Sequence, residues 1–117
     1  MYKRQCDVCL APSRWEGLGL PLYEATAFGM PIITNDKPPM SEMVHDGRSG
    51  ILVGSTQNGT ARSGIPAWDP DVAELAAAIE RLGDRAELER MRAGVAELAE
   101  ERSWSRTVAD LDALIGS

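Results

Sequence analysis

The stretch that decides the fold is residues 12–25, which read PSRWEGLGLPLYEA. The residues just before it, 7–13, are mostly apolar and are predicted to form a strand. Gly17 and Gly19 then allow a turn in which the backbone approaches a ligand closely. Pro21 suits the first position of a helix, where its missing N–H costs nothing. When a strand, a glycine turn and a helix follow in this order, the unpaired N–H groups and the positive end of the helix dipole lie at the carboxyl edge of the sheet. This arrangement favours the binding of phosphate.

The neighbouring segments extend the same pattern. Residues 32–34 and 51–53 are short, continuously apolar runs, as expected of buried parallel strands. A helix over residues 21–28, with Leu22, Ala25 and Phe28 on its buried face, is predicted to separate the first two strands. This alternation predicts an α/β fold, a Rossmann-like parallel sheet with flanking helices and right-handed crossovers.

The C-terminal end is predicted to be helical. Residues 54–68 have no periodicity and predict a long surface loop; Asp69 and Pro70 are expected to begin the first of three helices, and Asp84 and Ser103 to cap the next two. Trp68 and Trp104 are expected to pack at helix boundaries. The apolar positions expected to face the core are Val72, Leu75, Ala76, Ile79 and Leu82, then Leu88, Met91, Val95 and Leu98, and finally Val108, Leu111 and Leu114.

Length and charge exclude several classes of function. The chain has 117 residues, enough for one small domain. Its net charge of −6 argues against nucleic acid or an anionic membrane surface as the main partner. No apolar run approaches the ~20 residues that span a bilayer, and no signal-peptide pattern opens the chain. We expect a cytoplasmic protein. Peripheral attachment to the inner face of the membrane is compatible with this expectation.

Cys6 and Cys9 form a single C-x-x-C motif, which is compatible with a redox pair or with half of a zinc site. There is no second cysteine pair, and His45 is the single histidine, in a turn expected to be exposed. Both cysteines are therefore interpreted as small core residues.

Residues 1–5, MYKRQ, are polar and basic and adjoin the first predicted strand without a turn. The codons GTG-TAT-AAG-AGA-CAG would encode them if GTG served as the start, and this string matches the end of a transposase adaptor used in shotgun DNA sequencing. We expect a non-native, adaptor-derived tail over residues 1–5 and native sequence over residues 6–117. A genuine frayed N-terminus is the alternative.

Two carboxylates bracket the glycine turn, Glu16 before it and Glu24 in what is predicted to be the first helical turn. A pair of acids is compatible with a glycosidase-type acid and base. Alternatively each carboxylate accepts hydrogen bonds from sugar hydroxyls, or Glu24 is merely favourable near a helix N-terminus. A generic dinucleotide site needs G-x-G-x-x-G, and here only the first two glycines are in place, which disfavours NAD.

The pattern E-G-x-G-L-P-x-x-E-A over residues 16–25, followed by A-x-G-x-P over residues 27–31, resembles retaining glycosyltransferases of the GT-B fold, group 1 (family 4). The similarity continues through residues 41–47 and 50–53 and the start of the last helix. It implies that residues 6–117 are a partial nucleotide-sugar-binding domain, the C-terminal half of such an enzyme. The implied reaction transfers a sugar, typically a hexose, from a nucleotide-diphosphate sugar to a hydroxyl of an acceptor sugar, lipid or other compound.

The resemblance also implies roles for single residues. Glu16 would contact the donor-sugar hydroxyls, and Glu24 would hold the ribose hydroxyls. The backbone amides implied to meet the sugar and the two phosphates are those of Gly17, Leu18, Gly19 and Leu20. No metal and no other cofactor is expected, since the helix terminus and basic side chains replace a metal. Arg14 is either a phosphate ligand or a surface residue.

The sequence also departs from the family. The Arg and Lys that neutralise the leaving diphosphate, and the acceptor-binding domain, lie upstream in the family, so this chain alone is expected to be inactive. The 54–68 segment is longer than the usual link, and residues 37–42, KPPMSE, replace the common G-G-x-P-E. A non-catalytic nucleotide-sugar-binding or structural module of the same fold is the alternative function, and an epimerase is a more distant one.

Overall fold

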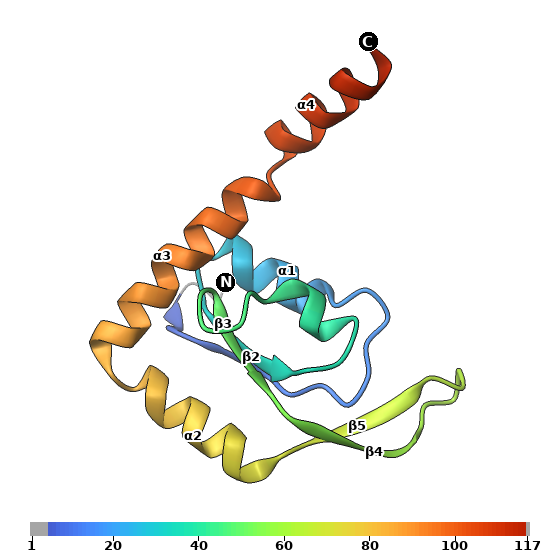
Figure 1. The fold of residues 1–117 in the computed structure, drawn as a ribbon, viewed down its shortest axis with the longest axis vertical. Coiled ribbons are helices and arrows are strands. Elements are labelled where there is room, and N and C mark those ends of the chain that lie inside the picture. Colours follow the sequence, from blue (N-terminus) through green and yellow to red (C-terminus); the bar gives the residue numbers. More distant parts are fainter. Residues whose placement is uncertain (1–4, 117) are drawn as a thin grey trace.

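The computed structural model describes residues 5–116, and residues 1–4 of the suspected tail lie outside this range. Its centre is a parallel sheet in the order β1-β2-β3, formed by Cys9–Ala11, Ile32–Asn35 and Gly50–Val53 (Figure 1). The helix α1, Leu20–Ala27, connects β1 to β2. The predicted α/β class and Rossmann-like parallel sheet are confirmed. The first strand is shorter than residues 7–13, because only Cys9, Leu10 and Ala11 pair with β2.

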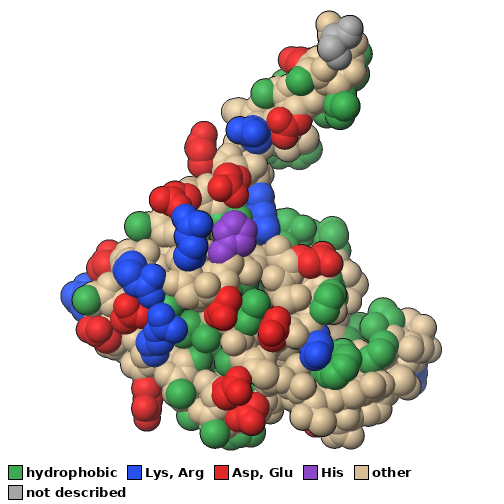
Figure 2. Space-filling view, viewed as in Figure 1, with side chains coloured by type: hydrophobic (Ala, Val, Ile, Leu, Met, Phe, Trp, Pro, Cys, Tyr) green, Lys and Arg blue, Asp and Glu red, His purple; other side chains and the backbone are tan. Residues whose placement is uncertain are grey.

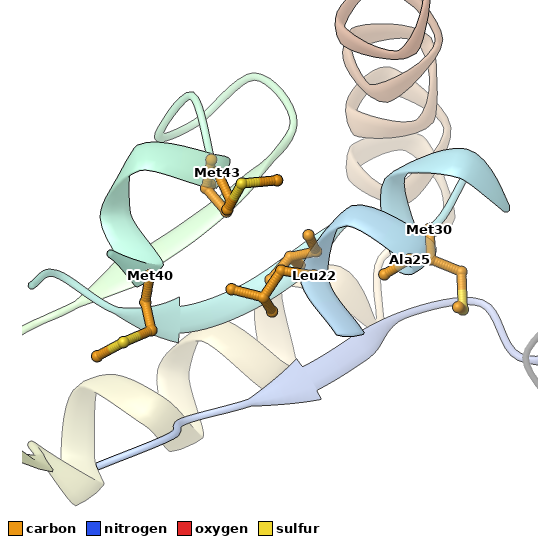
Figure 3. Packing of buried hydrophobic residues seen from close by; sticks show 7 residues of the cluster. Leu22, Ala25, Met30, Met40 and Met43 are labelled. Carbon is orange, nitrogen blue, oxygen red and sulfur yellow. The ribbon is translucent and has the colours of Figure 1, made fainter. Parts of the chain in front are cut away.

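Helices cover both faces of this sheet. On one face α1 and the 3-10 helix η2, Met40–Met43, enclose a cluster in which Leu22, Met40 and Met43 are at most 2% exposed (Figure 3). On the other face α2, Val72–Leu82, and α3, Arg85–Glu101, pack over Ile33, Ile51 and Val53. The central strand β2 is thus buried from both sides, which explains the apolar pair Ile32 and Ile33 at its start.

Some residues expected in the core lie elsewhere. Cys6 is exposed and Cys9 is only partly buried, because Cys6 precedes the strand and Cys9 lies on the edge strand β1. Phe28 is 39% exposed and is the C-terminal cap of α1. Thr26 is buried in its place and donates to the Leu22 carbonyl at 3.1 Å.

The predicted loop over residues 54–68 is wrong. It is an antiparallel hairpin of β4, Ser55–Thr60, and β5, Pro66–Pro70, which projects from the carboxyl end of β3 (Figure 1). The hairpin buries only Ala67 among its residues, so no apolar alternation marks its strands.

The start of α2 is also shifted relative to the prediction. Asp69 and Pro70 belong to β5, and Asp71 is the N-cap of α2, its side chain accepting from the Glu74 amide at 2.9 Å. Asp69 is instead held by hairpin contacts, so the later aspartate supplies the cap. Within α2 the helix buries Ala78 and Leu82 fully, while Val72 is 76% exposed.

The two C-terminal helices behave differently. The predicted caps Asp84 and Ser103 are confirmed, and all four predicted core residues of α3 are buried. The helix α4, Trp104–Ile115, has no buried residue, so the inward placement of its apolar side chains is wrong. It continues beyond α3 away from the sheet, with apolar side chains in view on its surface (Figures 1 and 2). The radius of gyration, 15.5 Å, exceeds the about 13 Å of a compact chain near this length because α4 and the hairpin project.

One close approach fixes α3 on the loop before β3. A Cβ atom built on Gly94 would lie 1.9 Å from the carbonyl oxygen of Arg48, so only glycine fits there. The outer face of α3 carries ion pairs such as Arg90–Glu87 at 3.0 Å and Arg92–Glu89 at 3.0 Å. Figure 2 shows the basic and acidic side chains interspersed on this part of the surface.

Candidate functional site

The candidate site lies at the carboxyl edge of the parallel sheet. Because the three strands are parallel, the segments that follow them meet at this edge. The loop over residues 12–19 follows β1, Asp36 and Lys37 follow β2, and the hairpin follows β3. The sequence stretch that suggested a phosphate site is therefore placed together with two segments that did not suggest one.

The N-terminus of α1 presents unpaired backbone donors. Gly19 is the N-cap, with φ of 79°, a left-handed conformation that glycine adopts without strain. The Leu22 and Tyr23 amides donate to the Gly19 carbonyl at 2.9 and 3.3 Å. Within residues 5–116, the four consecutive amides of Gly17, Leu18, Gly19 and Leu20 donate no hydrogen bond. These donors and the helix dipole together make a local environment that favours an anion.

Glu16 stands beside these amides with one carboxylate oxygen engaged. The Ser13 hydroxyl donates to Glu16 Oε1 at 3.0 Å, and the side chain is partly buried. No described residue donates to Oε2. The carboxylate is thus oriented at one oxygen and keeps the other for a hydroxyl donor.

Glu24 lies farther along α1 than predicted. The first turn of this helix contains no acidic residue, so Glu24 belongs to the second turn. The prediction took Pro21 as the first helical residue, whereas α1 begins at Leu20. Glu24 is exposed. A simple dipole role in the first turn is therefore excluded, and its proposed contact with ribose stays a prediction.

Arg14 is committed to the hairpin. Its Nε donates to Asp69 Oδ1 at 2.6 Å, and its Nη2 donates to the Asn58 carbonyl. The Asn58 side-chain amide donates to Asp69 Oδ2 at 2.6 Å. The hydrogen bond from Asn58 and then that from Arg14 lower the pKa of Asp69 below its usual value. Of the two roles open to Arg14, this geometry supports an ion pair on the surface.

Two residues at this edge were missed by sequence reasoning. The Lys37 ammonium lies 4.5 Å from the centroid of the Trp68 ring, a cation–π contact between the β2 loop and β5. The expectation that Trp68 packs at a helix boundary is wrong, because it lies in β5. Trp104 does lie at a helix boundary but is 84% exposed, so it does not pack there either. The position of Lys37 just after a parallel strand was the one available sequence signal, since that is where ligand-binding residues of such sheets occur.

Asn35 was missed as well. It is the last residue of the buried strand β2 and is 0% exposed. Its Nδ2 donates to the Ser13 carbonyl at 2.9 Å and to the Trp68 carbonyl at 3.2 Å. One side chain therefore joins the loop after β1 to the hairpin.

The structure also bears on three features that the sequence did not favour as sites: a metal centre, His45 and a membrane span. In the described part of the chain, no group of three or more His, Cys, Asp or Glu side chains could hold a metal ion. His45 is exposed in its turn, as expected. Among residues 5–116, no helix has the length and apolar character needed to cross a membrane.

The family described as glycosyl transferases group 1 matches residues 1–94, well over half of the chain. The chain belongs to the group 1 glycosyl transferases.

Relatives of this group 1 glycosyl transferase chain include proteins that are named as glycosyltransferases. It is 32% identical over 114 residues to a D-inositol 3-phosphate glycosyltransferase of Gordonia bronchialis, covering 97% of this chain and 21% of the relative. It is 35% identical over 79 residues to the lipopolysaccharide core biosynthesis mannosyltransferase LpsB of Rhizobium meliloti, covering 66% and 22%. An uncharacterized 41.2 kDa protein in the cps region of Klebsiella pneumoniae is 47% identical over 52 residues, covering 44% and 14%.

The group 1 chain spans less than a quarter of the length of each of these relatives. The family membership supports a sugar transferase in general.

Proposed function

We propose that the chain is the donor-binding part of a retaining glycosyltransferase that moves a hexose from a nucleotide-diphosphate sugar to an acceptor hydroxyl. The observation that carries the proposal is the N-terminus of α1, where four unpaired amides adjoin Glu16. A diphosphate supplies the negative charge that such a terminus favours. A sugar beyond the diphosphate supplies hydroxyls for Glu16 Oε2.

Different residues of the site would bind different parts of the nucleotide-diphosphate sugar. The amides of Gly17, Leu18 and Gly19 would bind the sugar-side phosphate and the sugar, and the Leu20 amide would bind the phosphate nearer the ribose. Glu24, one turn farther along α1, would accept hydrogen bonds from the ribose diol. No metal is required in this scheme, because backbone donors replace it at the diphosphate.

The proposed reaction exchanges one bond at the anomeric carbon for another. The bond from that carbon to the sugar-side phosphate oxygen breaks, and the acceptor oxygen bonds to the same face of the carbon. The acceptor hydroxyl proton passes to the departing diphosphate. Glu16 would orient the sugar and stabilise the positive charge that develops at the anomeric carbon.

The chain by itself is expected to bind the donor without transferring the sugar. Stabilising the leaving group is commonly the largest electrostatic contribution in such a transfer. Two basic side chains at this edge, Arg14 and Lys37, are engaged by Asp69 and by the Trp68 ring respectively. Further cations, and the site for an acceptor sugar, lipid or other hydroxyl compound, would have to come from another part of the complete protein.

Thermal unfolding of the purified chain with nucleotides tests the donor site. ADP, GDP and UDP and their glucose or mannose conjugates are expected to raise the unfolding temperature, and the corresponding monophosphates to raise it less. Glu24→Ala is expected to abolish this protection without lowering the unfolding temperature in the absence of ligand. Glu80→Ala, an exposed glutamate on α2, is the matched control and should keep the protection. The site assignment is wrong if no nucleotide protects the complete gene product that carries this chain.

A second candidate function is a non-catalytic nucleotide-sugar-binding module, which the engagement of both nearby cations favours. Transfer assays on the complete gene product separate the two. Sugar transfer with retention at the anomeric carbon supports the enzyme, and tight binding with no transfer to any acceptor hydroxyl supports the module.

A further inference from the structure

The hairpin β4–β5 is attached to the loop that carries Glu16, and four side chains make the attachment. Asn35, from β2, bridges the Ser13 and Trp68 carbonyls. Arg14, from the loop, reaches Asp69 and the Asn58 carbonyl on the hairpin. We call Asn35, Arg14, Asn58 and Asp69 the hairpin contact.

The hairpin contact fixes two consecutive backbone carbonyls of the loop. The Ser13 carbonyl accepts from Asn35, and the Arg14 carbonyl accepts from the Trp68 amide at 2.8 Å. A residue whose carbonyl and side chain are both held has little freedom to rotate its peptide plane. Ser13 and Arg14 therefore have a defined position relative to β5.

This restraint extends to Glu16 through one hydrogen bond. The same Ser13 whose carbonyl is held by Asn35 donates its hydroxyl to Glu16 Oε1 at 3.0 Å. Asn35 reaches Glu16 in two steps, without touching it. Functional carboxylates lose effectiveness when the groups behind them are loose, so such a support has a chemical consequence.

The orientation of Asn35 is itself unusual. Both carbonyls it contacts need a donor, which fixes the Nδ2 side of the amide and turns Oδ1 away from them. Oδ1 is buried and receives no hydrogen bond within the described residues. Buried polar atoms without a partner are rare in folded proteins.

We infer that the hairpin positions Glu16 for the donor sugar, with Asn35 and the Arg14–Asp69 pair as positioning residues. This inference rests on the proposed function, since it needs Glu16 to contact the sugar. The hairpin then determines how the chain discriminates a nucleotide-diphosphate sugar from the bare nucleotide diphosphate. The segment that sequence reasoning treated as a surface loop is on this inference part of the donor site.

The test measures the ratio of the two affinities in the complete gene product. UDP is paired with UDP-glucose and GDP with GDP-mannose, and the pair that binds more tightly is used. Arg14→Ala and Asp69→Ala are each expected to weaken the sugar nucleotide by about tenfold relative to the nucleotide diphosphate, the size of one charge-assisted hydrogen bond. The two substitutions change the local charge in opposite directions, so an equal effect on the ratio is not an effect of charge on the diphosphate.

The pair is exposed, with side-chain exposures of 50% and 42%, so its loss should leave the fold intact. Asn35→Ala is the third variant, and its unfolding temperature is measured alongside because it leaves two carbonyls unpaired. Arg48→Ala, which removes an exposed pair with Glu97 remote from the site, is the matched control and should leave the ratio unchanged.

A second background shows whether the contact acts through Glu16. Glu16→Ala is expected to lower the ratio as the hairpin variants do, and adding Arg14→Ala to it should change nothing further. If Glu16→Ala leaves the ratio unchanged, the proposed role of Glu16 is wrong and this inference falls with it. If Glu16→Ala lowers the ratio while Arg14→Ala and Asp69→Ala do not, the inference alone is wrong and the proposed function stands.

Discussion

The helices α3 and α4 follow each other in the chain and have similar caps and similar apolar spacing, yet α3 is packed in the core and α4 is exposed. Each begins at a capping side chain, Asp84 for α3 and Ser103 for α4. Each repeats apolar residues at helical spacing. The helix α3 buries all four of its predicted core residues, and α4 buries none.

The difference lies in what surrounds each helix. The helix α3 packs on α1, α2 and the loop before β3, whereas α4 runs away from the sheet (Figure 1). The side-chain interactions of α4 include its cap, the hydrogen bond from the Thr107 hydroxyl to the Ser103 carbonyl and the Arg106–Asp110 pair at 3.2 Å, all of them local. A helix of this length is marginal on local interactions alone. Amphipathic spacing therefore marks a face that suits burial, and the presence of a neighbour decides whether burial occurs.

The largest expected difference between the two helices is in the free energy of unfolding when one apolar residue of each is truncated to alanine. Met91→Ala, at a residue that is 0% exposed, should lower the free energy of unfolding by about 2–5 kcal/mol because it opens a cavity. Leu111→Ala, at a residue that is 49% exposed on α4, should change it by less than about 0.5 kcal/mol. Urea unfolding followed by circular dichroism measures both. Equal losses would mean that α4 is packed in solution, for example against a second copy of the chain.

An intermediate effect is expected where α3 approaches the loop before β3. Gly94→Ala would normally stabilise a helix by about 1 kcal/mol. Here the added Cβ would lie 1.9 Å from the Arg48 carbonyl oxygen, so we expect a loss of about 1–3 kcal/mol instead. Ala96→Gly, at an exposed position of the same helix, is the control and should cost about 1 kcal/mol from propensity alone. Stabilisation by Gly94→Ala would contradict the close packing of α3.

The smallest effect concerns an ion pair that joins α3 to α2 and that has no equivalent at α4. Hydrogen bonds from Arg90 and then Arg81 lower the pKa of Glu87 from 4.5 to about 2. A lowered pKa means that the carboxylate contributes stability above pH 4.5, and that this contribution is lost as the pH falls from 4.5 toward 2.

The pH dependence of the Glu87→Gln variant tests this contribution. The difference in unfolding free energy between the parent chain and Glu87→Gln should be small, constant above pH 5 and smaller at each step below it. Glu100→Gln, at an exposed position on α3, controls for the loss of a charge. A difference that grows as the pH falls would contradict the sign.

The candidate site was predictable to the extent that it depends on consecutive residues. The unpaired amides at residues 17–20 follow from two glycines and a proline at a strand-to-helix turn, and the structure places them as the sequence indicates. The contact between Lys37 and Trp68, and the bridge made by Asn35, join residues far apart in the chain. No spacing rule connects such residues, which is why sequence reasoning did not find them.

The sequence by itself determined the parallel sheet, the caps of α3 and α4 and the glycine turn, because each depends on the conformational preferences and hydrogen bonds of neighbouring residues. Only the tertiary structure decided that residues 55–70 form a hairpin, that this hairpin holds the loop of Glu16, and that α3 is buried while α4 is not. The physical reason is the same in all three cases. Burial and long-range pairing depend on which surfaces meet, and the sequence of an amphipathic or polar segment does not specify the segment that packs against it.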